Sequence, residues 1–322
     1  MMIDLFNVTN LYREIRADLS AADLTIDVLL SHVRQLGFPQ GHREFDAMYV
    51  FGDSLSDIGN SFNLTKKAQG EGLPPSPPYF MGRFSNGPVW VEYLARLLHL
   101  PSSLHTNFAI GGANTGSTNT YLQNNPDNLP GLQQQIDRFI APFKTGNSQA
   151  DSRAIYIIWA GANDYLGGGI TNPAIPVENL TNVVKSLAAV GAKHIMVANL
   201  PDLGDLPASR GNSLQSAALN ALTQAHNSGL ASSLSALSLS FGSSVNIITF
   251  DAHSLFKQIF TSPTQFDLTN ITDAELEQVA QFQGYKEKFL FWDIIHPTTA
   301  AHLILAKSVF SLLVPANVPL QV

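Results

Sequence analysis

From about residue 46 onward, short apolar runs alternate with longer stretches whose apolar residues recur at helical spacing. Most of the short runs lack the two-residue alternation of a strand with one face in water. Continuous apolar runs are typical of parallel strands, because the helices that connect such strands cover both faces of the sheet. Five runs, rich in branched and aromatic residues, are therefore predicted to be strands: 47–51, 107–110, 154–159, 194–199 and 245–250.

The stretches between these runs predict helices. In 90–98, apolar residues fall at positions i, i+3, i+4, i+7 and i+8, which gives a wide apolar stripe. Further helices are predicted near 130–142, 176–190, 212–238, 252–260 and 300–313. Strand–helix alternation predicts a right-handed α/β fold, a three-layer α/β/α sandwich around a mostly parallel sheet of about five strands. Ligands are expected at the carboxyl ends of the strands.

Two stretches interrupt this alternation. Residues 61–88 are too rich in proline for a helix or a central strand, and long loops in compact domains are often functional. Residues 262–291 are predicted to be an irregular insert with one short helix at 273–282.

The first 45 residues look like an added segment. Ile26, Leu29, Leu30 and Val33 recur at helical spacing and predict one apolar helix face. That face can pack on the main domain or form an oligomer contact. We therefore divide the chain into an N-terminal helical extension, 1–45, and a main domain, 46–322.

The composition excludes several classes of function. Eighteen Lys and Arg against 25 Asp and Glu give a net charge of −7, which argues against a nucleic-acid-binding or anionic-membrane surface. The absence of Cys excludes disulfides, thiolate catalysis and thiolate metal sites. No apolar run is long enough for a membrane span, and the first 20 residues lack the features of a secretory signal. We expect a cytoplasmic protein, or a secreted one if a leader has been removed, and the oligomeric state stays open.

The strongest local signal is Gly-Asp-Ser-Leu at 52–55, directly after the first predicted strand. Gly52 permits a tight turn, and a helix is predicted to begin near Ser54. The hydroxyl of Ser54 would then stand at the carboxyl end of a strand, where N–H groups of a helix start can face a developing anion. Ser54 with Asp57 also fits an ordinary helix N-cap, so only partners elsewhere in the chain can favour catalysis.

Asp293 and His296 supply such partners. Serine is a weak nucleophile that needs a base neutral near pH 7, which is the role of an imidazole. An Asp three residues before a His can reach the other ring nitrogen and hold the imidazole in place. The sequence thus predicts nucleophilic catalysis by Ser54 with His296 as base.

Two further glycine-containing segments follow predicted strands. Gly112 lies in a glycine pair after 107–110, where its N–H is unobstructed, and Asn163 follows Gly161 after 154–159. Both can donate a hydrogen bond to an oxyanion. Each also fits a plain structural role, a turn for Gly112 and an Asx turn for Asn163.

Together the four segments resemble the GDSL-type, or SGNH, serine hydrolases over most of residues 46–313. Gly-Asp-Ser-Leu at 52–55, the segment Asn-Phe-Ala-Ile-Gly-Gly-Ala at 107–113, Gly-Ala-Asn-Asp at 161–164 and Asp-Ile-Ile-His-Pro at 293–297 match that family's four blocks in order. The segment 82–87, Gly-Arg-Phe-Ser-Asn-Gly, is similar to the larger lipase and esterase branch. The α/β-hydrolase motif Gly-x-Ser-x-Gly is absent, which argues against that fold.

The resemblance implies a flavodoxin-like SGNH fold and a serine esterase or lipase without cofactor or metal. Ser54 would be the nucleophile, His296 the base and Asp293 its orienting partner. The N–H groups of Ser54 and Gly112 and the Asn163 amide would form the oxyanion hole.

The substrate must be selected by the loops. Tyr79, Phe80 and Phe84 can line an acyl or aryl pocket, or simply pack their loop down. We expect a small-molecule or lipid-like carboxylic ester rather than a large polysaccharide. An acyltransferase with the same residues and a carbohydrate O-acetyl esterase stay as alternatives. A metal-dependent hydrolase lacks a ligand motif such as His-Glu-x-x-His, and a flavin-binding protein would need a different first loop.

Overall fold

The computed structural model describes residues 44–146, 148–279 and 288–314. Its central sheet has four parallel strands in the order β1–β2–β3–β4. These are β1 (Met48–Gly52), β2 (Ile155–Trp159), β3 (His194–Ala198) and β4 (Asn246–Phe250).

The fifth predicted strand lies beside β1 without forming a regular strand. The Phe108 N–H donates to the Val50 carbonyl over 2.7 Å and the Ile110 N–H donates to the Gly52 carbonyl over 3.1 Å. One parallel bridge joins Val50 to Asn107. The segment 107–110 thus extends the four-stranded sheet at its β1 edge.

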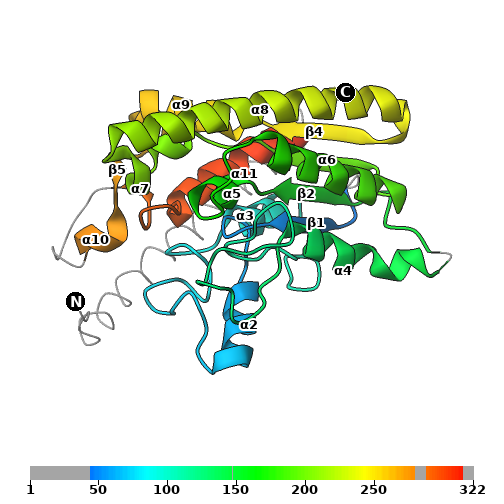
Figure 1. Ribbon diagram of the computed structural model, residues 1–322, viewed down its shortest axis with the longest axis horizontal. Coiled ribbons are helices and arrows are strands. Elements are labelled where there is room, and N and C mark those ends of the chain that lie inside the picture. The colour runs from blue at the N-terminus through cyan, green and yellow to red at the C-terminus, as the bar shows by residue number, and fades with distance from the viewer. Residues whose placement is uncertain (1–43, 147, 280–287, 315–322) are drawn as a thin grey trace, which may run out of the picture.

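Helices cover both faces of the sheet (Figure 1). One face carries α3 (Trp90–Leu97), α9 (Ala252–Thr261) and α11 (Thr299–Leu313), and the other carries α4 (Leu132–Lys144), α6 (Ala174–Ala189) and α8 (Ser213–Phe241). Neighbouring strand residues alternate between the two cores: Val50 and Met196 pack in the first, Phe51 and Val197 in the second. The predicted three-layer α/β/α fold is therefore confirmed, with β1, β2 and β3 almost fully buried and the edge strand β4 partly exposed.

Side-chain caps fix where three of these helices begin. Asn212 accepts hydrogen bonds from two N–H groups at the start of α8, Asp251 accepts one at the start of α9, and Thr298 accepts one at the start of α11. Such caps satisfy N–H groups that the first helical turn leaves without partners.

The proline-rich stretch 61–88 contains a helix, contrary to the sequence prediction. Helix α2 (Asn60–Gln69) ends before the first proline, Pro74, so no proline removes an N–H from it. Residues 70–89, which hold the prolines, form turns and bends as predicted.

The insert 262–291 adds secondary structure that packs on the main domain through Leu268, Leu290 and Phe291. It contains η3 (Pro263–Phe266), β5 (Asn270–Ala274), α10 (Glu275–Val279) and β6 (Phe289–Phe291). β5 and β6 pair in parallel as a separate two-stranded sheet. The helix predicted at 273–282 is wrong at its start, since residues 273 and 274 belong to β5, and 280–282 lie outside the described residues.

Four short elements complete the described chain: α5 (Ala162–Leu166), η1 (Leu203–Asp205), α7 (Pro207–Arg210) and η2 (Gly242–Ser244). Across the described ranges, no helix has the length and apolar character that a membrane crossing requires. The helix predicted within residues 1–45 lies outside the described residues, so the division at residue 46 stays a prediction.

Candidate active site

The site is built around Ser54, which follows β1 at the carboxyl end of the strand. No helix begins there, contrary to the sequence prediction: residues 53–59 form turns and bends. The carboxylate of Asp57 accepts the N–H groups of Gly59, Asn60 and Ser61, so the helix start lies six residues further on. Ser54 therefore occupies a turn rather than an N-cap.

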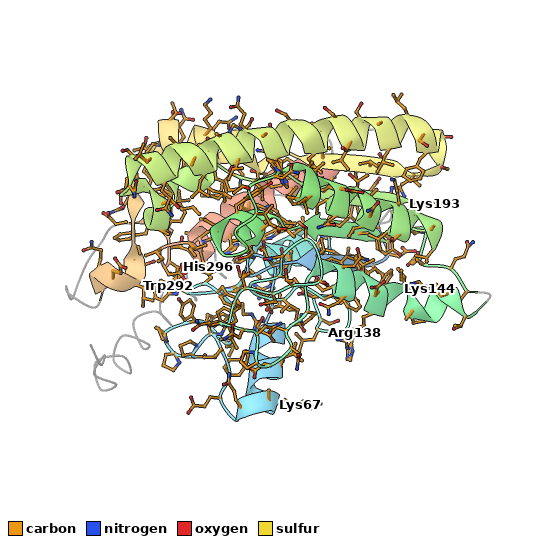
Figure 2. All side chains as sticks on the ribbon, viewed as in Figure 1. Lys67, Arg138, Lys144, Lys193, Trp292 and His296 are labelled. Carbon is orange, nitrogen blue, oxygen red and sulfur yellow. The ribbon has the colours of Figure 1, made fainter. Side chains whose placement is uncertain are left out.

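The structure brings Ser54, His296 and Asp293 together. The Ser54 Oγ lies 2.8 Å from His296 Nε2. On the other side of the ring, His296 Nδ1 lies 2.7 Å from Asp293 Oδ2 and 3.0 Å from Oδ1. Figure 2 shows His296 far from Lys193, the residue that precedes β3, which agrees with a site at the carboxyl ends of the strands.

A tight turn holds Asp293 and His296 on the same side. The Trp292 N–H donates to the His296 carbonyl over 2.7 Å. Asp293 Oδ1 accepts the N–H groups of Ile295 and His296 over 2.8 and 2.7 Å. The three-residue spacing thus forms a closed turn between β6 and α11, in which the Asp293 carboxylate reaches the His296 ring.

The environment keeps the Asp293 carboxylate ionised. Burial, the largest single influence, acts to raise the pKa of Asp293. The charge of His296 and the hydrogen bonds from His296 and Ile295 outweigh burial and lower this pKa to about 2. An ionised carboxylate at this position can stabilise a positively charged imidazolium.

The three groups predicted to donate to an oxyanion belong to Ser54, Gly112 and Asn163, of which Ser54 and Asn163 border one pocket. Gly112 has a φ of 74°, and a Cβ there would overlap the backbone of Tyr121, so only glycine fits. Among the described residues, the N–H groups of Ser54 and Gly112 have no hydrogen-bond acceptor. Asn163, on α5 after β2, donates its amide to the Ala113 carbonyl over 3.2 Å.

Two buried carboxylates fix the loop that carries Gly112. Asp57 Oδ2 accepts the Gly111 N–H over 3.0 Å, and Asp164 accepts the Thr115 N–H and hydroxyl over 2.9 and 2.7 Å. Burial raises the pKa of both carboxyls. These positioning roles were not predicted: each Asp stood inside a recognised motif, but its partner is far away in the sequence.

The three aromatic residues proposed to meet substrate have different surroundings. The Tyr79 hydroxyl donates to Asp293 Oδ2 over 2.8 Å. Phe84 is buried, with its ring centroid 5.1 Å from that of His296. Phe80 instead lies under the guanidinium of Arg83, 5.8 Å from the ring centroid. The structure brings Tyr79 into contact with Asp293 and Phe84 into contact with His296.

The motif at 82–87 joins the proline-rich loop to the His296 segment. The Ser85 hydroxyl donates to the Pro297 carbonyl over 2.9 Å, and Asn86 Oδ1 accepts the Thr299 N–H over 2.8 Å. These two hydrogen bonds hold Ser85 and Asn86 against the segment between His296 and α11, and we call them the clamp.

An apolar pocket opens beside Ser54. Asp53, Ser54, Leu55 and Asn163 border it, and its other walls are Trp159, Ala162, Leu166, Leu200, Pro201, Leu203, Leu206, Phe256, Phe291, Ile295 and Pro297. Most of these come from segments after β3, from α9 and from β6, so their sequence positions gave no signal of a shared pocket. At its border, burial raises the pKa of Asp53 to about 7.

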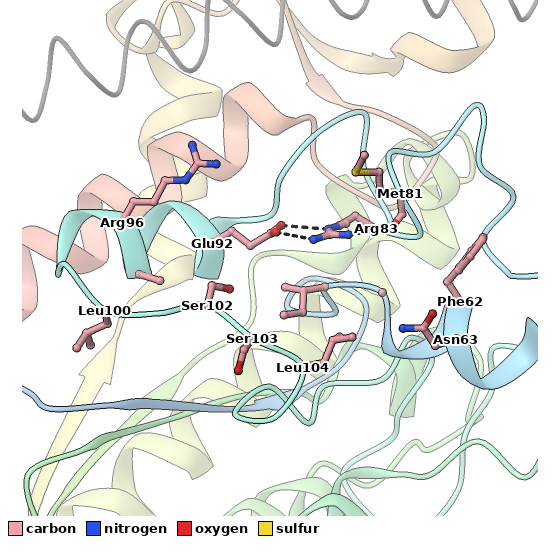
Figure 3. A pocket seen from close by; sticks show the side chains of 13 residues that line it. Phe62, Asn63, Met81, Arg83, Glu92, Arg96, Leu100, Ser102, Ser103 and Leu104 are labelled. Carbon is pink, nitrogen blue, oxygen red and sulfur yellow. Dashed lines mark hydrogen bonds and ion pairs between the residues drawn. The ribbon is translucent and has the colours of Figure 1, made fainter. Parts of the chain in front are cut away.

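A larger, open hollow lies between α2 and α3 (Figure 3). Arg83, on its wall, is occupied by structural partners: its guanidinium pairs with Glu92 over 2.6 Å and donates to the Met81 carbonyl over 2.8 Å. Neither Ser54 nor His296 lines this hollow. In the described part of the chain, no group of three or more His, Asp or Glu side chains is arranged to hold a metal ion.

The chain is similar to a hemolysin, an acyltransferase and a lipolytic protein. The chain is 27% identical over 280 residues to the thermolabile hemolysin of Vibrio parahaemolyticus, covering 82% of this chain but only 63% of that protein. It is 28% identical over 312 residues to the phosphatidylcholine-sterol acyltransferase of Aeromonas hydrophila, covering 82% and 88%. A solved structure from Veillonella parvula, a member of the lipolytic protein G-D-S-L family, matches with a TM-score of 0.42 and 14% identity, covering 83% and 97%.

The model of the GDSL-like Lipase/Acylhydrolase family matches residues 48–309, well over half of the chain. All four predicted blocks lie inside this range. Carboxylic ester hydrolysis, the activity predicted from the sequence, is the chemistry that the family name describes. The protein therefore belongs to the GDSL-like lipase/acylhydrolase family.

Proposed function

We propose that this protein hydrolyses carboxylic esters through a covalent acyl-enzyme formed on Ser54. The observation that carries the proposal is the continuous contact from the Ser54 hydroxyl to the His296 ring and on to the Asp293 carboxylate. A serine becomes a nucleophile when a neutral imidazole accepts its proton, and the carboxylate fixes the tautomer that can do so.

The reaction proceeds in two halves. His296 Nε2 accepts the Ser54 proton while Oγ attacks the ester carbonyl, and the imidazolium then gives this proton to the leaving alcohol. A water molecule, deprotonated by His296, attacks the acyl-enzyme and releases the acid, and the proton returns to Ser54. Throughout, Asp293 stays ionised and stabilises the imidazolium.

The tetrahedral intermediates carry a negative oxygen that needs donors in place before the reaction. The N–H groups of Ser54 and Gly112 and the amide of Asn163 supply them. In the structure the Asn163 amide contacts the Ala113 carbonyl, so substrate binding would exchange that weak acceptor for the oxyanion. One donor of this kind contributes about 10²–10³ to kcat.

A fluorophosphonate tests the nucleophile directly, because it phosphonylates a serine only when that serine is activated. We expect stoichiometric labelling, with the modified peptide containing Ser54 by mass spectrometry. Ser54→Ala should abolish both labelling and hydrolysis of nitrophenyl esters. Undiminished esterase activity in that variant would refute the assignment. Ser56→Ala, two residues away, provides a matched control that keeps an intact triad.

Acyl transfer is a second candidate function, favoured by the similarity to a phosphatidylcholine-sterol acyltransferase. An alcohol would then replace water in the second half-reaction. Product analysis with and without an added acceptor alcohol separates the two: a new ester at the expense of free acid indicates transfer, whereas unchanged release of free acid indicates hydrolysis.

A further inference from the structure

The apolar pocket beside Ser54 has a defined position relative to the reacting atoms. Ser54 and Asn163 border it, whereas His296, whose ring centroid lies 5.1 Å from that of Phe84, is not among its lining residues. In the tetrahedral intermediate the reacting carbon carries the Ser54 oxygen, the oxyanion, the leaving oxygen and the acyl chain.

These four groups cannot exchange places. The leaving oxygen must face His296, because His296 gives it a proton. The oxyanion must face the N–H donors and Asn163. The acyl chain takes the remaining position, and the apolar pocket that Ser54 itself borders offers space for it. The pocket is therefore suited to the acyl part of the ester rather than to the alcohol.

The pocket is small. Its cavity volume is about 40 Å³, whereas an engineered apolar cavity that accepts benzene has about 150 Å³. A space of this size holds one or two carbon groups beyond the carbonyl. It is too short for an extended fatty acyl chain.

The walls that limit its depth belong to the main hydrophobic core. Leu203, Leu206 and Phe256 are all at most 6% exposed and pack in the core on the α3, α9 and α11 side of the sheet. Close-packed interiors do not yield readily to extra methylene groups. A longer chain could enter only by displacing these side chains.

We infer that this pocket is the acyl-binding site and that it restricts the enzyme to esters of short acyl groups, acetyl to propionyl. The inference rests on the proposed function and specifies its substrate class. The alcohol part then lies on the His296 side, near Tyr79 and Phe84, where the site is not enclosed by the pocket.

A series of 4-nitrophenyl esters tests the inference, since the leaving group stays constant while the acyl chain grows. We expect the kcat/KM of the acetate to exceed that of the octanoate at least tenfold, because one misfitting methylene is worth about 10–200-fold in a closed apolar pocket. Equal or higher kcat/KM for the octanoate, measured below its micellar concentration, would overturn the inference.

A variant that enlarges the pocket provides a second test of the inference. Leu206→Ala should raise the octanoate-to-acetate ratio of kcat/KM at least tenfold. Leu237→Ala, a similarly buried leucine in α8 outside the pocket, is the matched control and should leave the ratio unchanged. If circular dichroism shows that Leu206→Ala does not fold, Leu166→Ala, which trims a partly buried wall residue, replaces it. A ratio that matches the control in the folded variant contradicts the inference.

The outcome is distinguishable from failure of the proposed function itself. Labelling at Ser54 by a fluorophosphonate together with a preference for long acyl chains would support the proposed function and contradict only the short-acyl assignment. The absence of both labelling and activity on every ester of the series would contradict the proposed function and the short-acyl assignment alike.

Discussion

The hydroxyl of Tyr79 donates a 2.8 Å hydrogen bond to Oδ2 of Asp293, the same oxygen that lies 2.7 Å from His296 Nδ1. Tyr79 stands 214 positions before Asp293 in the chain. Burial, together with the charge of Asp293 and this hydrogen bond, raises the pKa of Tyr79, so the hydroxyl remains protonated and donating. Tyr79 and His296 thus share one acceptor, and the phenol withdraws negative charge from the carboxylate that faces the imidazole.

Tyr79→Phe should move the acid limb of the kcat/KM profile to higher pH. Without the phenol, Asp293 becomes a stronger acceptor and holds the protonated imidazole more firmly. A hydrogen bond to a charged group is worth about 1.5 kcal/mol, so the shift should be up to about one pH unit. A pH–rate profile measures it.

Tyr156→Phe is the control, because it also removes a tyrosine hydroxyl bond, here to the Asp151 carbonyl, without touching the triad. An acid limb that moves equally in both variants, or toward lower pH in Tyr79→Phe, would argue for a purely structural role of Tyr79.

Asn163→Ala should lower kcat by about 10²–10³ while KM changes little. In the proposed mechanism the amide stabilises charge that appears only in the transition state. Among the described residues, its only side-chain hydrogen bond is the 3.2 Å bond to the Ala113 carbonyl. Steady-state kinetics and an unchanged unfolding midpoint would support this. A decrease in kcat of less than tenfold would show that Asn163 is not an oxyanion donor.

Asp164→Asn should lower both stability and kcat. The amide would turn an NH₂ group toward the Thr115 N–H or hydroxyl, which leaves buried donors without an acceptor at a cost of about 1–3 kcal/mol. The loop that carries Gly112 would then be less well held. Urea unfolding and kcat measure the two effects.

Asp137→Asn is the matched control for that experiment, since Asp137 forms an exposed ion pair with Lys144. It should change the free energy of unfolding by no more than about 0.5 kcal/mol. Asp164→Asn with full kcat would show that Asp164 does not position the oxyanion donor.

Asp53 should make the protein less stable as the pH rises. Burial raises the pKa of Asp53 from 3.8 to about 7, so between these values the folded state binds its proton more tightly than the unfolded chain. The free energy of unfolding therefore falls from pH 4 to pH 7. Asp53→Asn should flatten this slope, because the amide does not titrate.

Urea unfolding at pH 4.5 and pH 7 compares wild type with Asp53→Asn. Asp57 and Asp164, whose pKa values are also raised by burial, contribute in the same direction and leave some slope in the variant. Parallel slopes for the two proteins would rule out a raised pKa at Asp53.

The sheet and its helices could be predicted from the sequence because their signal is local. The short run 154–159, rich in branched and aromatic residues, favours a strand covered on both faces, and the apolar stripe of 90–98 favours a helix. Helix α2 was missed since its residues were grouped with the prolines that follow. The start of that helix depends on the Asp57 carboxylate rather than on Ser54, and both residues fit a cap in sequence alone.

The contact between Ser54, His296 and Asp293 could be predicted because the three residues lie in short motifs with recognisable chemistry. The pocket could not, since Leu206 and Phe256 have the pattern of ordinary core residues. Tyr79 was predicted to line a substrate pocket, and its bond to Asp293 depends on the path of a proline-rich loop that carries no periodic signal. Long-range packing decides such contacts, and no local pattern encodes it.

The clamp of Ser85 and Asn86 on Pro297 and Thr299 has a consequence for biosynthesis. A growing polypeptide carries Ser54 for 242 residues before His296 leaves the ribosome. In the proposed mechanism Ser54 has no base until His296 lies beside it, so a partly synthesised chain would not attack esters in its surroundings. The ability to hydrolyse esters would therefore appear only once β6 and α11 are in place. Its appearance during translation or refolding would mark the completion of the native state.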